Sequence, residues 1–478
     1  MMDFVLNPNV PYYKYFEEMT RIPHGSFHEQ PYSDYLVAWA KEHGLHHLQD
    51  EMGNVVIYKP ASAGYEDRPA VLLQAHIDMV CACDPGQDHD FRKDPLELYV
   101  EDGWLRAKGT TLGADDGVGV AYMLSILDDD TLPHPPLECV FTVQEEVGCS
   151  GAANLKAEYF TAKRMIGLDD VGGGTSYVTT AGSQIIEFSR QVTWEKGQQK
   201  GYRLSVSGLK SGHSGVDIDK ERGNAIKIAG KVLFALLKQG SVRLCDADMG
   251  SADNVIPSHG TVTFTSVLSR EQVSATVDQY REIFLQQLQW SDPDLKMELS
   301  ECTVDQVMSA QDSADLIGFV RFLPNGYFHH SMRFEGLTTV SSNLGTWKVE
   351  GDTVCFRCCS RSSMESFIDM MEEEQEMVCE AYHIQRRETA RVAGFDYIEN
   401  SPIRAAVDRA FFTTTGRHIQ ELFVHGGIEA GYLTRLIPGL DVVTIGPLVL
   451  DEHTTSERLS LQSFDEIWKT LTRALSEL

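Results

Sequence analysis

Apolar residues in the first third of the chain fall into short runs of strand length, separated by segments with helical spacing. The expected strands are residues 55–58, 71–74, 137–143 and 165–168, and the expected helices are 34–43 and 116–127. The last third repeats this alternation, with a helix near 403–413 and a strand at 442–445. Because strands separated by helices form parallel ladders with both faces covered, we predict an α/β fold with a mixed, largely parallel sheet sandwiched by helices.

The middle of the chain, from residue 185 to 391, has a different pattern. Alternating strands are expected at 202–206, 260–267 and 353–359, and long helices at 222–237, 271–289 and 364–382. This α+β pattern interrupts the α/β pattern on either side. We therefore predict that residues 1–183 and 394–478 form one domain and that residues 184–393 form an inserted α+β domain.

Size, charge and cysteine content restrict the class of protein. A chain of 478 residues exceeds the size at which one core stops growing, which fits two domains. The net charge, 41 − 70 = −29, repels phosphates and anionic lipids, so neither nucleic-acid nor membrane binding is expected. Neither a membrane-spanning run nor a secretory signal is evident, and scattered cysteines suit reduced thiols, so we expect a cytoplasmic protein. We interpret the pair Cys355 and Cys358 as strand packing because no second pair accompanies it.

Candidate metal ligands follow the ends of three expected strands. They are His76 and Asp78 after residues 71–74, Glu145 and Glu146 after 137–143, and Asp169 after 165–168. Open α/β sheets bind ligands at the carboxyl ends of their strands, so we expect these side chains in one cleft.

Two further candidates lie in turns. Asp115 lies in Leu-Gly-Ala-Asp-Asp-Gly before an expected helix, and His453 follows the last expected strand in Asp-Glu-His. Several carboxylates in one cleft raise one another's pKa unless cations compensate their charge. Two divalent ions would do so, and imidazole with carboxylate suits zinc, with cobalt or manganese as alternatives. If one aspartate bridges both ions, each has three protein ligands and an open position for water.

The motifs AHIDMV, LGADDGVG, QEEVG, GLDD and DEHTTSERL resemble, in order and spacing, those of the dinuclear-zinc peptidase family that includes aminoacylases, carboxypeptidase G and carnosinases. The resemblance covers essentially the whole chain, including CDPGQDHDF, GLKSGHSGVDI, SSNLG and HGGIEAG. It implies that His76, Asp115 and Asp169 hold one metal ion and that Glu146, Asp115 and His453 hold the other.

The same resemblance implies the remaining roles in the α/β domain. Asp78 would orient His76 through a hydrogen bond, and Glu145 would be the general base that activates a metal-bridging water. The implied activity is that of a dinuclear metal-dependent dipeptidase of broad specificity, including Xaa-His substrates. Two departures from the family pattern are Asp116, where Asn is common, and His-Thr-Thr-Ser, where His-Ser-Pro is common. The bond between Asp115 and Asp116 is expected to be cis.

For the insert, the resemblance implies a lid that also pairs two chains into a homodimer. His213 and Asn254 match lid positions suited to the oxyanion of a small peptide substrate, and Arg361 matches one suited to its terminal carboxylate. Gly427, in the Gly-rich turn HGGIEAG with His425 and Glu429, is a candidate for substrate contact. The alternative to pocket lining is a purely structural turn.

Two rival functions stay open. One is an N-acyl-amino-acid deacylase or desuccinylase of the same family, which differs only in the acyl group removed. The other is a metal-retaining homologue that has lost catalysis, although a binding site has no need of Glu145 as a carboxylate free of metal beside Glu146. Comparing dipeptides with N-acetyl and N-succinyl amino acids as substrates separates these functions.

Overall fold

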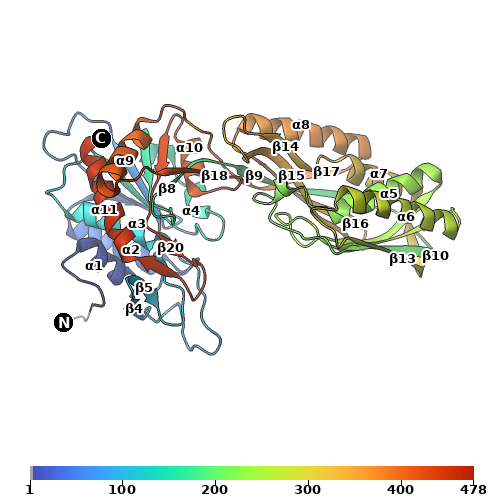
Figure 1. The fold of residues 1–478 in the computed structure, drawn as a ribbon, viewed down its shortest axis with the longest axis horizontal. Coiled ribbons are helices and arrows are strands. Elements are labelled where there is room, and N and C mark those ends of the chain that lie inside the picture. The colour runs from blue at the N-terminus through green and yellow to red at the C-terminus, as the bar shows by residue number, and fades with distance from the viewer. Residues whose placement is uncertain (1–3) are drawn as a thin grey trace. The chain divides into compact units, whose positions relative to one another are not determined.

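The computed structural model describes residues 4–478, which fold into two compact units (Figure 1). The first unit contains the described residues up to Thr179, together with Phe395–Phe423 and Ile428–Leu478. The second contains Thr180–Gly394 and Val424–Gly427.

The first unit is built on a six-stranded sheet of order β1-β2-β6-β3-β7-β19. Its strands are β1 (His46–Gln49), β2 (Val55–Lys59), β3 (Val71–His76), β6 (Leu137–Thr142), β7 (Arg164–Gly167) and β19 (Asp441–Thr444). The pairs β6–β3, β3–β7 and β7–β19 are parallel, and β1 and β2 are antiparallel. The mixed, largely parallel sheet that the sequence predicts is therefore confirmed.

Both faces of this sheet are buried, because successive side chains of β3 enter different cores. Leu73 packs in a core shared with the helices α1, α2, α3, α9 and α11, whereas Leu72 packs in one shared with α4 and α10. The helices are α1 (Pro11–Met19), α2 (Gln30–Glu42), α3 (Ala114–Asp128), α4 (Ser150–Ala153), α9 (Pro402–Thr415), α10 (Glu429–Leu436) and α11 (Leu461–Glu477). Helices on both faces explain the continuous apolar runs of the central strands.

Two small sheets complete the first unit. One has the order β20-β21-β5-β4 and the other pairs β18 with β8. Their strands are β4 (Leu98–Glu101), β5 (Trp104–Ala107), β8 (Thr175–Thr180), β18 (Gln420–Val424), β20 (Val449–Leu450) and β21 (Arg458–Ser460). The loop between β20 and β21 carries His453, so the first of these sheets fixes both ends of that loop.

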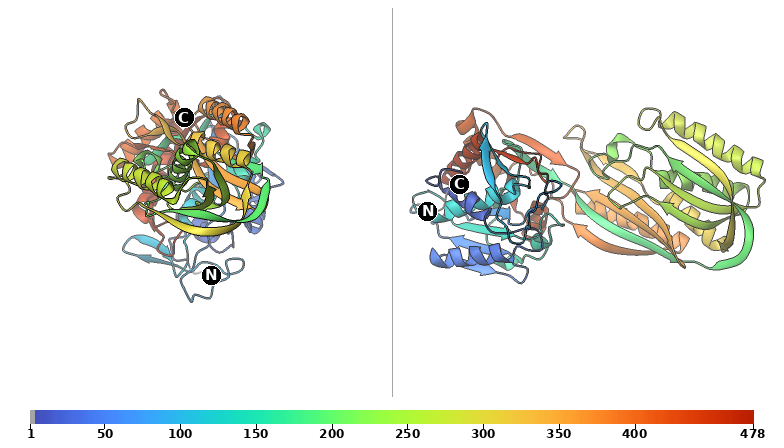
Figure 2. Two further views of the ribbon diagram at one scale, coloured as in Figure 1. Left: turned by 90° about the vertical axis from the view of Figure 1, so that its right-hand side faces the viewer. Right: turned by 90° about the horizontal axis from the view of Figure 1, so that it is seen from below.

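The second unit is an antiparallel sheet with helices packed against it (Figure 2). The strand order is β13-β10-β12-β11-β15-β16-β9-β17, with β14 paired to β15. The strands are β9 (Gly182–Gln191), β10 (Trp194–Ser207), β11 (Val242–Met249), β12 (Gly260–Ser266), β13 (Lys296–Met308), β14 (Gly326–His330), β15 (Thr338–Glu350), β16 (Thr353–Ser362) and β17 (Gln385–Val392). The helices are α5 (Ala225–Gln239), α6 (Arg270–Gln287), α7 (Ala310–Phe322) and α8 (Glu365–Tyr382).

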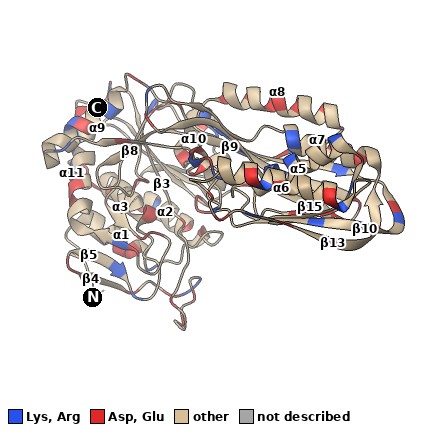
Figure 3. Cartoon of the chain, turned by 45° about the vertical axis from the view of Figure 1, so that its right-hand side comes forward, with Lys and Arg blue, Asp and Glu red and all other residues tan. Residues whose placement is uncertain are grey.

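Acidic side chains occur on helices of both units, including α1, α2, α6 and α8 (Figure 3). The negative charge of the chain is therefore spread over many elements. Between residues 4 and 478, no helix is both long and apolar enough to span a bilayer. The ten cysteines are all free thiols, and Cys358 packs in the core of the second unit.

Candidate active site

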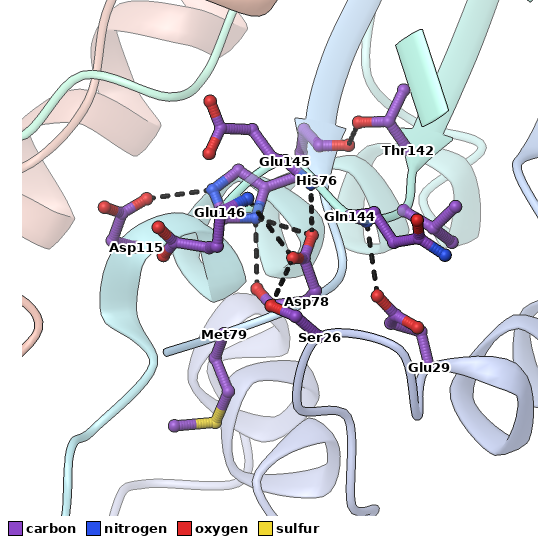
Figure 4. Close-up of polar contacts among 12 residues, drawn as sticks. Ser26, Glu29, His76, Asp78, Met79, Asp115, Thr142, Gln144, Glu145 and Glu146 are labelled. Carbon is purple, nitrogen blue, oxygen red and sulfur yellow. Dashed lines mark hydrogen bonds and ion pairs between the residues drawn. The ribbon is translucent and has the colours of Figure 1, made fainter. Parts of the chain in front are cut away.

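The parallel pairing of β3, β6 and β7 brings their carboxyl ends to one edge of the sheet. His76 is the last residue of β3 and lies beside Thr142, the last residue of β6. Glu145 and Glu146 follow β6 after a turn, and Asp169 follows β7. Figure 4 shows His76, Asp115, Glu145 and Glu146 grouped at this edge.

Asp115 lies between two histidines that are far apart in sequence. Its Oδ1 is 2.9 Å from His76 Nε2, and its Oδ2 is 3.3 Å from His453 Nε2. His453 Nε2 is also 3.0 Å from Glu146 Oε1, and His76 Nε2 is 3.9 Å from Asp169 Oδ1. The structure thus gathers all five side chains that the sequence analysis assigned as metal ligands, with a different oxygen of Asp115 facing each histidine.

The charge of this cluster is unbalanced. Burial and the nearby charge of Asp115 raise the pKa of Asp169 well above its usual value. The neighbouring carboxylates of Asp115 and Glu146 raise the pKa of His453 to about 10. These shifts have the direction expected when carboxylates gather with too little positive charge between them, which is the condition that bound cations relieve.

The donor set fits divalent metal ions. His76 Nδ1 lies 3.0 Å from the backbone carbonyl of Asp78, which can only accept, so Nδ1 carries a hydrogen and Nε2, which faces Asp115, is the nitrogen that would bind an ion after losing its proton. Glu146 Oε1 is buried, and its approach to His453 does not have hydrogen-bond geometry, so no described residue donates to this oxygen. Ligand atoms of His76, Asp115 and Glu146 lie within 4.8 Å of one another. Imidazole nitrogen and carboxylate oxygen together suit zinc.

Asp78 connects several segments around His76. Its side-chain Oδ1 is 3.5 Å from His76 Nδ1, so the backbone carbonyl makes the shorter contact with the ring. The same Oδ1 accepts the backbone N–H of Glu145 at 2.9 Å, and Oδ2 accepts the hydroxyl of Ser26 at 2.8 Å. Asp78 therefore ties the loop after β6 to the end of β3, beyond the single contact with His76 that the sequence analysis expected.

Glu145 is held apart from the histidines. Its Oε1 accepts the thiol of Cys149 at 3.4 Å, and burial is the main cause that raises its pKa above the usual value of a glutamate. Near the same loop, Glu29 Oε1 accepts the backbone N–H of Gln144 at 3.2 Å (Figure 4). Neither Cys149 nor Glu29 was identified from the sequence.

Glu429 is a buried carboxyl group behind these strand ends. Its Oε2 accepts hydrogen bonds from Gln74 at 2.7 Å and from Thr142 at 2.6 Å, which joins β3, β6 and the start of α10. Burial raises its pKa to about 8. The sequence leaves open whether Glu429 lines a pocket; in the structure it contacts the strands beneath the site.

The second unit has its own cluster of cationic and imidazole groups. Arg361 is buried, with Nε 3.4 Å from Ser214 Oγ and a terminal nitrogen 3.5 Å from His213 Nε2. His213 Nδ1 accepts the backbone N–H groups of Gly215 and Val216, so Nε2 carries the hydrogen. Two donors therefore face each other, an arrangement that favours an acceptor such as a carboxylate between them.

The other candidates of the second unit differ in exposure. Asn254 is exposed, while its backbone carbonyl accepts the N–H of Ser214 at 2.8 Å. Gly427 is also exposed, and a Cβ there would lie 2.5 Å from a methyl group of Val392. His425 is buried with Nε2 2.7 Å from Ser341 Oγ, and burial lowers its pKa to about 3. His425 is thus a neutral side chain of this unit.

Asp116 occupies a position where Asn is common in the family that the sequence resembles, and the peptide bond before it still has the expected conformation. The bond between Asp115 and Asp116 is cis. Asp116 is buried and its Oδ1 accepts the backbone N–H of Gly119 at 3.1 Å, within the first turn of α3. The side chain of Asp116 therefore caps the first turn of the helix, and Asp115 remains the candidate metal ligand of this pair.

Comparisons with known proteins find similarity along almost the whole chain. Residues 72–477 match the sequence profile of peptidase family M20/M25/M40. The chain is 32% identical to the cytosol non-specific dipeptidase of Escherichia coli (strain K12), over 98% of this chain and 97% of that protein.

Solved structures show the same fold. The crystal structure of aminoacylhistidine dipeptidase from Vibrio alginolyticus is similar with a TM-score of 0.91 and 30% identity, covering 100% of this chain and 98% of that one. A tripeptidase from Staphylococcus aureus is similar with a TM-score of 0.56 and 17% identity, covering 99% of both chains, which supports the fold alone.

Proposed function

The chain belongs to peptidase family M20/M25/M40, and from that premise we propose that it is a metal-dependent dipeptidase of broad specificity, with aminoacyl-histidine dipeptides among its substrates. The observation that carries the proposal is Asp115, which presents one oxygen to His76 and the other to His453. The E. coli and V. alginolyticus relatives, which match at 32% and 30% identity along almost their whole length, are named as dipeptidases.

The proposed cofactor is a pair of divalent ions, with zinc favoured and cobalt or manganese as alternatives. His76, Asp115 and Asp169 would hold one ion, and Glu146, Asp115 and His453 the other. When bound, such ions supply Lewis-acid activation of water and of the scissile carbonyl.

Glu145 is the proposed general base. It takes a proton from the attacking water while the water oxygen bonds to the carbonyl carbon of the peptide. It then gives this proton to the amine nitrogen as the carbon–nitrogen bond breaks, so that an amino acid leaves from each side. Burial, which raises the pKa of Glu145, suits a group that must accept and return a proton near neutral pH.

We propose that the second unit recognises the substrate's C-terminal end. The facing donors of Arg361 and His213 favour a carboxylate, which every free dipeptide carries at its C-terminus. Asn254 and His213 would steady the oxyanion, Gly427 would contact the substrate, and the unit would act as a lid. On the family resemblance, we also propose a homodimer paired through this unit. The name of the E. coli relative supports a cytoplasmic location.

A substrate panel tests the function. The metal-free protein, the zinc-loaded protein and the cobalt-loaded protein are assayed on free dipeptides, N-acetyl amino acids and N-succinyl amino acids. Metal-dependent hydrolysis of dipeptides, Xaa-His among them, supports the proposal. Preference for an N-acyl amino acid makes the chain a deacylase, and metal binding with no hydrolysis of any substrate makes it a non-catalytic homologue.

A further inference from the structure

Glu457 makes a buried contact next to the candidate metal site that the proposed chemistry does not use. Only 3% of this residue is exposed, and its two oxygens accept three successive backbone N–H groups. The distances are 2.7 Å from Leu112, 3.2 Å from Gly113 and 2.8 Å from Ala114. Three backbone donors thus face this one carboxylate, which ties the side chain to the turn before Asp115.

These three N–H groups immediately precede Asp115. Gly113 has φ 69°, in the left-handed region, and is the N-cap of α3. The backbone departs from helical geometry at Asp115 and Asp116, and Asp116 caps the turn that follows, so Glu457 satisfies the donors of the separate turn before this break. The contact therefore fixes the backbone from which Asp115 projects.

Glu457 also ends the loop that carries His453. That loop runs from β20 to β21, and His453 lies in it with φ 65°, a conformation that costs free energy unless its surroundings impose it. The His453 side chain is 46% exposed, so packing alone does not hold it near Asp115. The loop needs an anchor, and Glu457 connects it directly to the Asp115 turn.

We propose that Glu457 is a positioning residue that holds the turns of Asp115 and His453 in register, so that both side chains can share a metal ion. The inference rests on the metal site in the proposed function and goes beyond it by naming the contact that assembles the site from two segments more than 300 residues apart. Carboxylates that orient ligands typically change metal affinity by about 10–100-fold when removed.

The test measures Co²⁺ binding to the full-length protein, first stripped of metal, by titration followed through visible absorption. Glu457→Gln keeps the size of the side chain but replaces one acceptor oxygen with an NH2 group that faces backbone donors. Glu457→Asp keeps the charge but shortens the reach by one methylene. The matched control is Glu138→Gln, since Glu138 is buried in the same unit and accepts the backbone N–H groups of Thr161 and Ala162 away from the site.

We expect wild type and Glu138→Gln to bind two Co²⁺ per chain with equal affinity, and both Glu457 variants to bind at least one Co²⁺ about tenfold more weakly. If Glu457→Gln does not fold, Glu457→Asp decides the question by the same measure. A folded Glu457 variant with wild-type affinity for both ions overturns the inference. A wild-type protein that binds no Co²⁺ overturns the metal site of the proposed function instead.

Discussion

Glu145 and Glu146 are neighbours in the chain, yet their surroundings give them different chemistry. Glu146 Oε1 lies beside His453 and has no hydrogen-bond donor among the described residues, which suits a metal ligand. Glu145 has its backbone N–H fixed by Asp78 and its carboxylate bonded to Cys149. One residue is therefore turned toward the candidate metal ligands, and the other is held beside them, which supports its proposed role as the base.

Replacing Glu145 should separate catalysis from metal binding. We expect Glu145→Gln to lower kcat by about 10²–10⁴-fold, because a neutral amide cannot accept the proton, while both ions stay bound. Metal content by elemental analysis and steady-state rates on one dipeptide measure the two effects. The matched variant, Glu146→Gln, should lose metal affinity as well as activity. Near-normal turnover by Glu145→Gln would assign the base to another residue.

At the residue scale, the sequence was informative where chemistry follows secondary structure. His76, Glu146 and Asp169 could be predicted because each follows a recognisable apolar strand. The contacts of Glu429 and Ser26 could not, since each depends on a partner that only the tertiary fold brings near, for example Thr142 287 residues from Glu429. The local pattern of apolar and polar residues gives no indication of a hydrogen bond between such distant residues.

At the element scale, one lysine side chain in each unit binds the carbonyl oxygens at the end of a helix. Lys59 Nζ donates to the carbonyl oxygens of Ile126, Leu127 and Asp129 at the end of α3. Lys227 Nζ donates to those of Val320, Arg321 and Leu323 at the end of α7. The last carbonyls of a helix lack intrahelical donors, and a cation there also suits the helix dipole.

Because the two lysines lie in different units, their replacement should destabilise different parts of the molecule. Lys59→Met should lower the free energy of unfolding of the first unit by about 2–3 kcal/mol, since it leaves buried carbonyls without donors. Lys227→Met should do the same to the second unit. Hydrogen exchange of peptides from each unit, measured in both variants, tells them apart. Equal loss of protection in both units from either variant would contradict independent caps.

The boundaries of elements were less predictable than their existence. The helix expected at 34–43 is α2, which begins at Gln30 and includes Pro31 in its first turn, where a helix tolerates proline. Strand β13 was not anticipated, since its residues are largely polar and exposed on an outer strand of the sheet. Hydrophobic periodicity detects buried faces, so an element that buries little of itself is missed.

At the scale of the whole molecule, all five proposed metal ligands lie in the first unit, so metal removal should affect the two units unequally. Each ion stabilises the folded state by RT ln(1 + [L]/Kd), or about 2.7 kcal/mol at a free concentration of 100 Kd. We expect chelation to lower the unfolding temperature of the first unit and to leave hydrogen exchange in the second unchanged. Asp115→Ala should abolish this response to chelator, whereas Glu145→Gln should retain it.

The second unit provides the other whole-molecule prediction, which concerns substrate recognition. Arg361 is buried and faces the N–H of His213, so a substrate carboxylate would complete this pair of donors. Arg361→Ala should then raise KM for free dipeptides by about 30-fold or more, because the loss of a charge-assisted pair costs about 2–5 kcal/mol. Dipeptide amides, which lack the carboxylate, should be hydrolysed with little change in KM.

A matched control distinguishes recognition from a structural role of Arg361. Arg357 lies on the same strand, β16, but 58% of its side chain is exposed, and Arg357→Ala should leave KM for both substrates near the wild-type value. Arg361→Lys keeps the charge and loses the bidentate fork, so its KM for free dipeptides should fall between those of wild type and Arg361→Ala. Equal losses on dipeptides and their amides would mean that Arg361 holds the second unit together and does not bind the carboxylate.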